Sequence, residues 1–135
     1  MRYEDLPLVG QGGMLQLYRW VATVEPHALT TRVNIASGTD EILVVRRVFL
    51  TARRVTQPTT SNLTYTSCYL VRGTDRHDIV YLMLLPNEYP VFRSYSEQLN
   101  FPLVSGVSIK VDTYDGSTGG LVEYTANIFV ERFSV

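Results

Sequence analysis

Residues 107–131 read VSIKVDTYDGSTGGLVEYTANIFVE, and apolar and polar side chains alternate at both ends of this stretch. Every second residue from Val122 to Val130 is apolar, whereas most residues between them are polar. Successive side chains of a β-strand point to opposite faces, so this period of two predicts strands with one buried face. The glycine-rich segment 116–120 can supply the positive φ angles of a hairpin turn, and we expect the two strands to pair antiparallel.

The same alternation recurs along the chain, which is rich in the β-branched residues Val, Ile and Thr. Such side chains suit a pleated, half-buried surface, and no long segment has the apolar spacing and the cap of a helix. We predict further strands at residues 15–24, 29–35, 42–55, 63–72, 79–85 and 99–104. A total of about eight strands predicts an all-β fold, an antiparallel β-sandwich of jelly-roll type.

Two of these predicted strands have special features. Strand 42–55 is long, and Arg46-Arg47 interrupts its apolar run, so we expect a bulge or a change of phase there. Segment 79–85 consists of consecutive apolar residues and is stopped by Pro86. It is too short for a typical helix, and its composition predicts a strand buried on both faces at the centre of a sheet.

The length of 135 residues corresponds to one domain. Residues 1–14 combine apolar side chains with Pro7 and several glycines, which predicts an N-terminal arm on a glycine hinge. Residues 15–135 then form the single β-sandwich domain. Residues 86–102 predict a long loop, and its aromatic side chains indicate a functional rather than a disordered segment.

The charge balance argues against a nucleic-acid partner. The chain has 12 basic and 13 acidic residues and a net charge of -1, so it lacks the basic surface that neutralises phosphates. No apolar run is long enough to predict a membrane span, and the acidic start does not resemble a secretory signal. We therefore expect a protein made in a cytoplasm and kept there or assembled from there.

Lys110 is the only lysine among the basic residues, and the others are arginines. Arginine is enriched at protein interfaces and lysine is depleted there, but genomic base composition or a warm host explains the excess equally well. Adjacent residues of a strand point to opposite faces, so the doublets Arg46-Arg47 and Arg53-Arg54 do not predict a continuous phosphate-binding stripe.

The sequence predicts no catalytic, cofactor-binding or metal-binding residue. His27 and His77 are far apart, and the charged segment 75–78 is interpreted as an exposed hairpin turn. Cys68 lies between apolar neighbours and is expected in the core rather than as a nucleophile. Trp20 and most of the tyrosines are likewise expected in the core of the sandwich.

Two segments, IASGTDEILV at 35–44 and FPLVSGVSIKV at 101–111, follow a short N-terminal arm in an order that resembles known virus proteins. The chain is similar in architecture to the jelly-roll capsid decoration, or auxiliary, proteins of tailed bacteriophages. That resemblance implies a non-enzymatic virion protein without cofactors, assembled in the host cytoplasm. It also implies a homotrimer on the capsid surface that binds the major capsid protein and stabilises the shell, with arms over neighbouring capsomers.

Few charges, an apolar arm and an aromatic loop together predict surfaces that contact other subunits. We expect the arm to dock on a neighbour and the loop aromatics to contribute to a subunit interface. The predicted interface residues are Leu6, Leu8, Val9, Tyr89, Phe92, Tyr95 and Phe101. The alternative is a carbohydrate- or receptor-binding module of a phage particle, with Trp20 or loop tyrosines stacking on a sugar. An enzyme is the least favoured interpretation.

Overall fold

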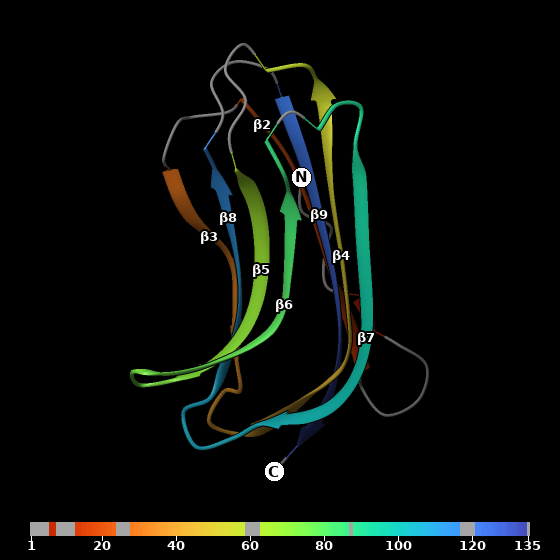
Figure 1. Ribbon diagram of the computed structural model, residues 1–135. Helices are drawn as coiled ribbons and strands as arrows, with labels where there is room; N and C mark the ends of the chain where they lie inside the picture. The colour runs from red at the N-terminus through yellow and green to blue at the C-terminus, as the bar shows by residue number, and fades with distance from the viewer. Residues whose placement is uncertain are drawn as a thin grey trace.

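The structure is a computed structural model that describes residues 6–7, 13–23, 28–58, 63–86, 88–116 and 121–134, with side chains from Leu29 onward except those of Asp115 and Ser134. Every regular element in these ranges is a β-strand (Figure 1). The strands are β1 (Leu6–Pro7), β2 (Gly13–Thr23), β3 (Ala28–Ala36), β4 (Glu41–Thr56), β5 (Thr64–Arg72), β6 (Asp75–Leu84), β7 (Phe92–Leu103), β8 (Ser108–Asp115) and β9 (Leu121–Ser134). The described residues include no helix that could cross a membrane.

The strands form two antiparallel sheets that face each other, as Figure 1 shows. One sheet has the order β1-β2-β9-β4-β7, and the other has the order β3-β8-β5-β6. From β2 to β9, the first strand pairs with the last, the second with the next to last, and so on inward to the β5–β6 hairpin. This nested pairing is the topology of a jelly roll, so the predicted fold class is confirmed.

The predicted hairpin between the two C-terminal strands is wrong. β8 pairs with β3 and β5 in one sheet, whereas β9 pairs with β2 and β4 in the other. Both strands have an apolar face, and the core forms when those faces meet across the sandwich instead of lying side by side in one sheet. The two strands, although consecutive in the sequence, therefore lie in different sheets.

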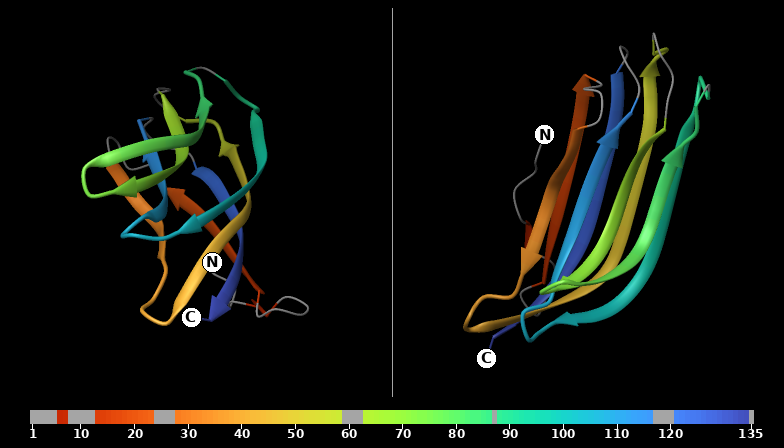
Figure 2. Two further views of the ribbon diagram at one scale, coloured as in Figure 1. Left: turned by 90° about the horizontal axis from the view of Figure 1, so that it is seen from below. Right: turned by 60° about the vertical axis from the view of Figure 1, so that its left-hand side comes forward.

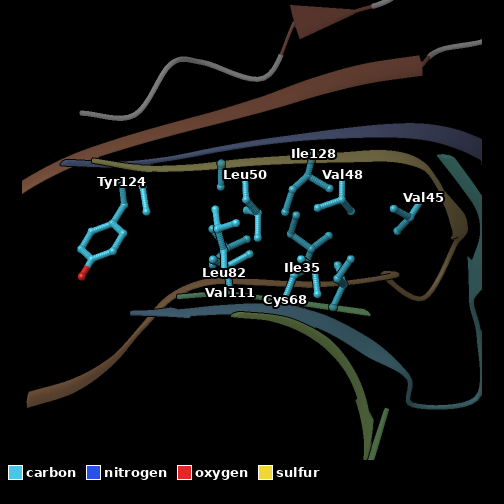
Figure 3. Close-up of a cluster of buried hydrophobic side chains, with 14 of the residues drawn as sticks. Ile35, Val45, Val48, Leu50, Cys68, Leu82, Val111, Tyr124 and Ile128 are labelled. Atoms are coloured by element: carbon cyan, nitrogen blue, oxygen red, sulfur yellow. The ribbon is translucent and has the colours of Figure 1, made fainter. Parts of the chain in front are cut away.

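The hydrophobic core lies between the sheets (Figure 3). The five-stranded sheet contributes Val48 and Leu50 from β4 and Tyr124 and Ile128 from β9, all fully buried. The opposite sheet contributes the alternate residues of β3, β5, β6 and β8 that point inward. Cys68 is fully buried among them, which confirms the prediction that it is a core residue.

The predicted change of phase in the long strand β4 is confirmed. The register of β4 shifts between Val45 and Arg47 against both of its neighbours, so Arg46 is an extra residue in the strand. Val45 and Val48 consequently both point into the core, although they are three positions apart. Arg46 points outward, where its Nη2 donates a hydrogen bond of 2.5 Å to Glu131 Oε1.

The prediction that residues 79–85 form a central strand buried on both faces is wrong. β6 is the edge strand of the four-stranded sheet, and only its inward side chains, such as Leu82 and Leu84, are buried. Tyr81 and Met83 point outward and are exposed. A run of apolar residues is typical of a central strand, but here the outer face of an edge strand is also apolar.

The predicted loop at residues 86–102 is mostly strand. β7 begins at Phe92 and pairs with β4 along most of its length, with a shift of register opposite Arg46. Its residues alternate weakly in polarity because the strand lies at the edge of its sheet and most of its side chains are exposed. At the N-terminus, Leu6 and Pro7 pair with Leu15 and Met14 of β2, and the arm of residues 1–14 stays a prediction.

Candidate interaction surface

An apolar and aromatic surface covers one end of the outer face of the four-stranded sheet. The strand register aligns Leu29 of β3 with Tyr114 of β8, Tyr114 with Tyr65 of β5, and Tyr65 with Met83 of β6. These four side chains form a row across the sheet, and Tyr81 stands next to it on β6. We call Leu29, Tyr65, Tyr81, Met83 and Tyr114 the tyrosine face.

The rings of the tyrosine face pack against one another. The centroids of Tyr65 and Tyr81 lie 4.4 Å apart at an interplanar angle of 20°, which is a stacked pair. The centroids of Tyr65 and Tyr114 lie 5.2 Å apart at 31°. Aromatic pairs at such separations stabilise each other beyond the area they bury, so the rings form a preorganised platform.

The tyrosine face is open to solvent. Leu29 is 60% exposed, Tyr81 is 46% exposed and Met83 is 41% exposed. Moving side chains of this kind out of water is favourable, and contiguous exposed patches of them mark interaction sites. The chemistry that this surface offers is contact with a flat apolar group, such as an aromatic side chain of another protein or the face of a sugar ring.

A polar layer lies beside the tyrosine face on the same side of the sheet. The hydroxyl of Tyr69 donates a 2.9 Å hydrogen bond to Asp112 Oδ2, and the guanidinium of Arg76 lies 3.7 Å from the centroid of the Tyr69 ring. Burial and the hydrogen bond to Asp112 raise the pKa of Tyr69. Asp112 Oδ1 and Ser67 Oγ are buried without a hydrogen-bond partner among the described residues.

Arg54 fixes the connection between β6 and β7. It points inward and is almost completely buried, and its Nη1 donates hydrogen bonds of 2.8 Å to the carbonyl of Leu85 and 2.7 Å to that of Glu88. Burial lowers the pKa of the guanidinium, and nearby Glu88 opposes this shift. Its neighbour Arg53 is exposed, so this doublet sends one arginine to either face as predicted.

The predicted interface residues do not form one patch. Tyr89 and Phe92 are exposed close together in sequence at the start of β7. Tyr95 packs against the core and donates a 3.1 Å hydrogen bond to Glu97 Oε2. Phe101 lies near the other end of β7, in a hollow of about 340 Å³ that is also lined by Val107.

The residues predicted in the N-terminal arm are described only in part. Leu6 belongs to β1, and its backbone pairs with that of Leu15. Its side chain lies outside the described side chains, and Leu8 and Val9 lie outside the described residues. Trp20 belongs to β2, and its side chain is likewise not described. The docking role of this arm stays a prediction.

Groups with catalytic potential do not converge in the described part of the chain. No three or more His, Cys, Asp or Glu side chains there are arranged to hold a metal ion. Burial raises the pKa of the Cys68 thiol to about 12, so the thiolate that a nucleophile requires is absent at neutral pH. His77 lies on β6 beside the exposed ion pair of Arg76 and Asp78, in which Nε and Oδ1 are 2.7 Å apart.

Sequence reasoning missed the tyrosine face. Of the tyrosines whose side chains are described, only Tyr69 and Tyr124 are buried, so the prediction that most of the tyrosines are core residues is wrong for this part of the chain. The outward positions on β5 and β8 are occupied by Tyr65 and Tyr114, where a solvent-facing sheet usually has polar residues. The available signal was the tyrosine that stands among polar residues on the outward side of each of these two alternating strands.

Comparison with known proteins identifies no family. No family model matches the chain, and no curated protein matches it. Among solved structures, infectious bursal disease virus Gt strain aligns with 97% of this chain at 12% identity and a TM-score of 0.35. The Gx strain of that virus aligns with 97% of this chain at 13% identity and a TM-score of 0.29. The chain spans only 38% and 37% of the length of those two chains.

Proposed function

We propose that the chain is a non-enzymatic structural protein of a virus particle, which decorates and stabilises the capsid of a tailed bacteriophage as a homotrimer. The single observation that carries this proposal is the exposed tyrosine face. In the trimer, the tyrosine face of each subunit packs against a neighbouring copy. Tyr89, Phe92, Tyr95 and Phe101 contribute to further contacts between subunits, and Leu6, Leu8 and Val9 dock on the major capsid protein.

The composition of the tyrosine face supports contact with protein. Tyrosine and methionine are enriched at protein interfaces, and rigid aromatic side chains dominate the binding energy at interfaces. The jelly-roll topology agrees with the proposal, because this fold builds many capsid domains, although it also builds lectins and cupins. Fold alone therefore does not decide among these functions, and the proposal depends on the surface.

Sedimentation velocity tests the proposed trimer. Wild-type protein is expected to contain species of three times the 15.3 kDa mass of one chain, or multiples of it. The double variant Tyr81→Ser/Met83→Ser is expected to lose these species, because it removes the apolar contact but leaves the inward side of β6 intact. The control Arg47→Ser changes an exposed residue of β4 and should keep them. A wild-type monomer at all concentrations, or trimers in the double variant, would refute the proposal.

Binding to a shell tests the proposed location. Wild-type protein is expected to co-sediment with empty shells assembled from the major capsid protein of the same virus. Deletion of residues 1–13 should abolish this binding while the trimer persists. Unchanged binding after the deletion would refute the docking role of the arm, and no binding by the intact chain would refute capsid decoration.

The alternative is a carbohydrate- or receptor-binding module of a phage particle, and one observation favours it. Tyr65 and Tyr81 form a stacked aromatic surface, and Ser67 lies directly opposite Tyr81 in the strand register. An aromatic platform with polar groups beside it suits the apolar face and the hydroxyls of a sugar. A glycan array in which wild-type protein binds and Tyr81→Ala does not would support this alternative. A blank array would reject glycan binding.

A further inference from the structure

β7 has one edge that pairs with no strand in the described part of the chain. It is the last strand of the five-stranded sheet and pairs with β4 alone. The right-hand view of Figure 2 places it at the outer margin of the molecule. A long open edge is a template for pairing with another chain, and proteins manage such edges by blocking or covering them.

The hydrogen bonds of β7 reveal which of its backbone groups face this open edge. The amide of Arg54 donates a 3.2 Å hydrogen bond to the carbonyl of Val91, so this pair of β4 and β7 residues is hydrogen-bonded. Hydrogen-bonded and non-hydrogen-bonded residue pairs alternate along an antiparallel ladder, and the register is regular from Phe92 to Gln98. The amides and carbonyls of Phe92, Ser94, Ser96 and Gln98 therefore point away from β4, toward the open edge.

The regular part of β7 has Tyr95 at its centre. Before it, Pro90 has no amide hydrogen to donate. After Gln98 the register with β4 shifts, and Asn100 has a φ of 88°. The segment 92–98 is therefore the part of the edge that can pair as a straight strand.

The charges on this segment are self-complementary. Arg93 and Glu97 lie two residues before and two residues after Tyr95, on the same face of the strand. In an antiparallel pair centred on Tyr95, Arg93 of one copy faces Glu97 of the other, and Ser94 faces Ser96. A parallel pair in register would instead bring identical charges together, which is destabilising.

We propose that β7 pairs with β7 of a second copy across a two-fold axis at Tyr95, which joins the two five-stranded sheets into one continuous sheet. In this arrangement Ser94 and Ser96 exchange backbone hydrogen bonds across the axis. Phe92 and Gln98 exchange them at the two ends of the contact. Tyr95 and its counterpart form a non-hydrogen-bonded pair, the kind of pair in which the side chains come closest.

Existing contacts already hold the charged groups at the edge. Arg93 Nη2 lies 2.5 Å from Glu88 Oε2, and Glu88 Oε1 accepts a 2.6 Å hydrogen bond from the amide of Leu85. The Arg93 side chain is 44% exposed, so its guanidinium remains accessible to a second carboxylate. Tyr95 donates its hydroxyl hydrogen to Glu97, which orients that carboxylate beside the axis.

A two-fold contact of this kind is closed, because the same segment serves both subunits. It cannot close a ring of three subunits, so in a trimeric protein it joins one trimer to another. The inference rests on the proposed function only in that both require copies of the chain to associate. The two contacts use different strands, and variants can therefore remove them separately.

Charge reversal at Arg93 and Glu97 tests the pairing. Arg93→Glu and Glu97→Arg each create two like-charge pairs across the axis, and each is expected to weaken the two-fold contact about ten-fold in sedimentation equilibrium. An equimolar mixture of the two variants restores both pairs, as does the double variant Arg93→Glu/Glu97→Arg, so both should recover wild-type association. Single variants that associate like wild type, or a mixture that does not recover, would overturn the proposal.

A disulfide at the axis tests the register. Residues opposite each other in a non-hydrogen-bonded pair have Cα atoms about 4.5 Å apart, which is within reach of a disulfide. Tyr95→Cys should therefore form a covalent dimer on oxidation, whereas Ser94→Cys should not, because Ser94 faces Ser96 rather than its own counterpart. Both variants are made with Tyr81→Ser/Met83→Ser, so that the tyrosine face does not contribute. Efficient cross-linking of Ser94→Cys, or none of Tyr95→Cys in folded protein, would overturn the register.

Discussion

Arg54 places a charged side chain at the inner face of a sandwich because its guanidinium satisfies the carbonyls of Leu85 and Glu88. A guanidinium taken out of water is stabilising only where such partners are fixed, and removing it leaves buried acceptors without donors. The residue thereby ties the end of β6 to the start of β7. Tyr89 lies in the segment between them.

Replacement of Arg54 is therefore expected to be costly. Arg54→Met should lower the free energy of unfolding by about 2 kcal/mol, since hydrogen bonds from a charged donor are lost. The control Arg53→Met removes only the exposed ion pair with Glu123 and should cost at most about 1 kcal/mol. Urea unfolding of both variants measures the difference, and equal costs would contradict the anchoring role of Arg54.

Ionisation of the Cys68 thiol makes the free energy of unfolding depend on pH in the alkaline range. The thiol ionises near its ordinary pKa of 9.0 in the unfolded chain but only near 12 in the folded protein, mainly because it is buried. Between these values the unfolded state loses the proton and the folded state keeps it, so rising pH favours unfolding. The free energy of unfolding should fall by up to about 1.4 kcal/mol per pH unit from this group.

Cys68→Val is the matched control for this pH dependence. It keeps a small apolar side chain in the core and removes the ionisable group. The comparison belongs between pH 9 and pH 10, because Tyr69 and Tyr81 also have raised pKa values and ionise in the unfolded chain at higher pH. Parallel stability curves for wild type and Cys68→Val would contradict the buried thiol as the cause.

At the scale of elements, the residue that follows β8 contacts the residue that precedes β5. The amide of Gly116 donates a 2.9 Å hydrogen bond to the carbonyl of Leu63, and a Cβ atom at Gly116 would overlap that carbonyl oxygen. Gly116→Ala should therefore destabilise the protein by about 1 to 3 kcal/mol. A Cβ at Gly38 meets only the flexible side chain of Glu41, so Gly38→Ala should change stability by less than about 0.5 kcal/mol. Thermal unfolding of both variants gives the comparison.

The strands themselves could be predicted from the sequence, because alternation is a local property. Residues 29–35 and 122–130 show it clearly, and both lie in strands of the structure. Strand order depends on contacts between distant segments, and for this reason the expected hairpin of residues 107–131 failed. The exposed face of β6 could not be predicted either, since apolar residues at an edge and at the centre of a sheet have the same local pattern.

The candidate sites divide in the same way. Exposed aromatics at Tyr89 and Phe92 follow from the composition of their segment. The tyrosine face requires the register that aligns β3, β8, β5 and β6, and the symmetry of β7 about Tyr95 acquires meaning only when β7 is known to be an edge. Both surfaces belong to the outside of the sandwich, whereas sequence patterns report mainly on its inside.

At the scale of the whole molecule, two separate contact surfaces on one subunit allow assemblies larger than either contact alone produces. Wild-type protein should form species larger than a trimer at high concentration. Arg93→Glu should leave trimers, and Tyr81→Ser/Met83→Ser should leave dimers joined through β7. The combination of all three changes should leave a monomer of 15.3 kDa. Native mass spectrometry of the four proteins distinguishes these species. If either Arg93→Glu or Tyr81→Ser/Met83→Ser is already monomeric, the two surfaces are not independent. The division of the assembly into a three-fold and a two-fold contact would then be wrong.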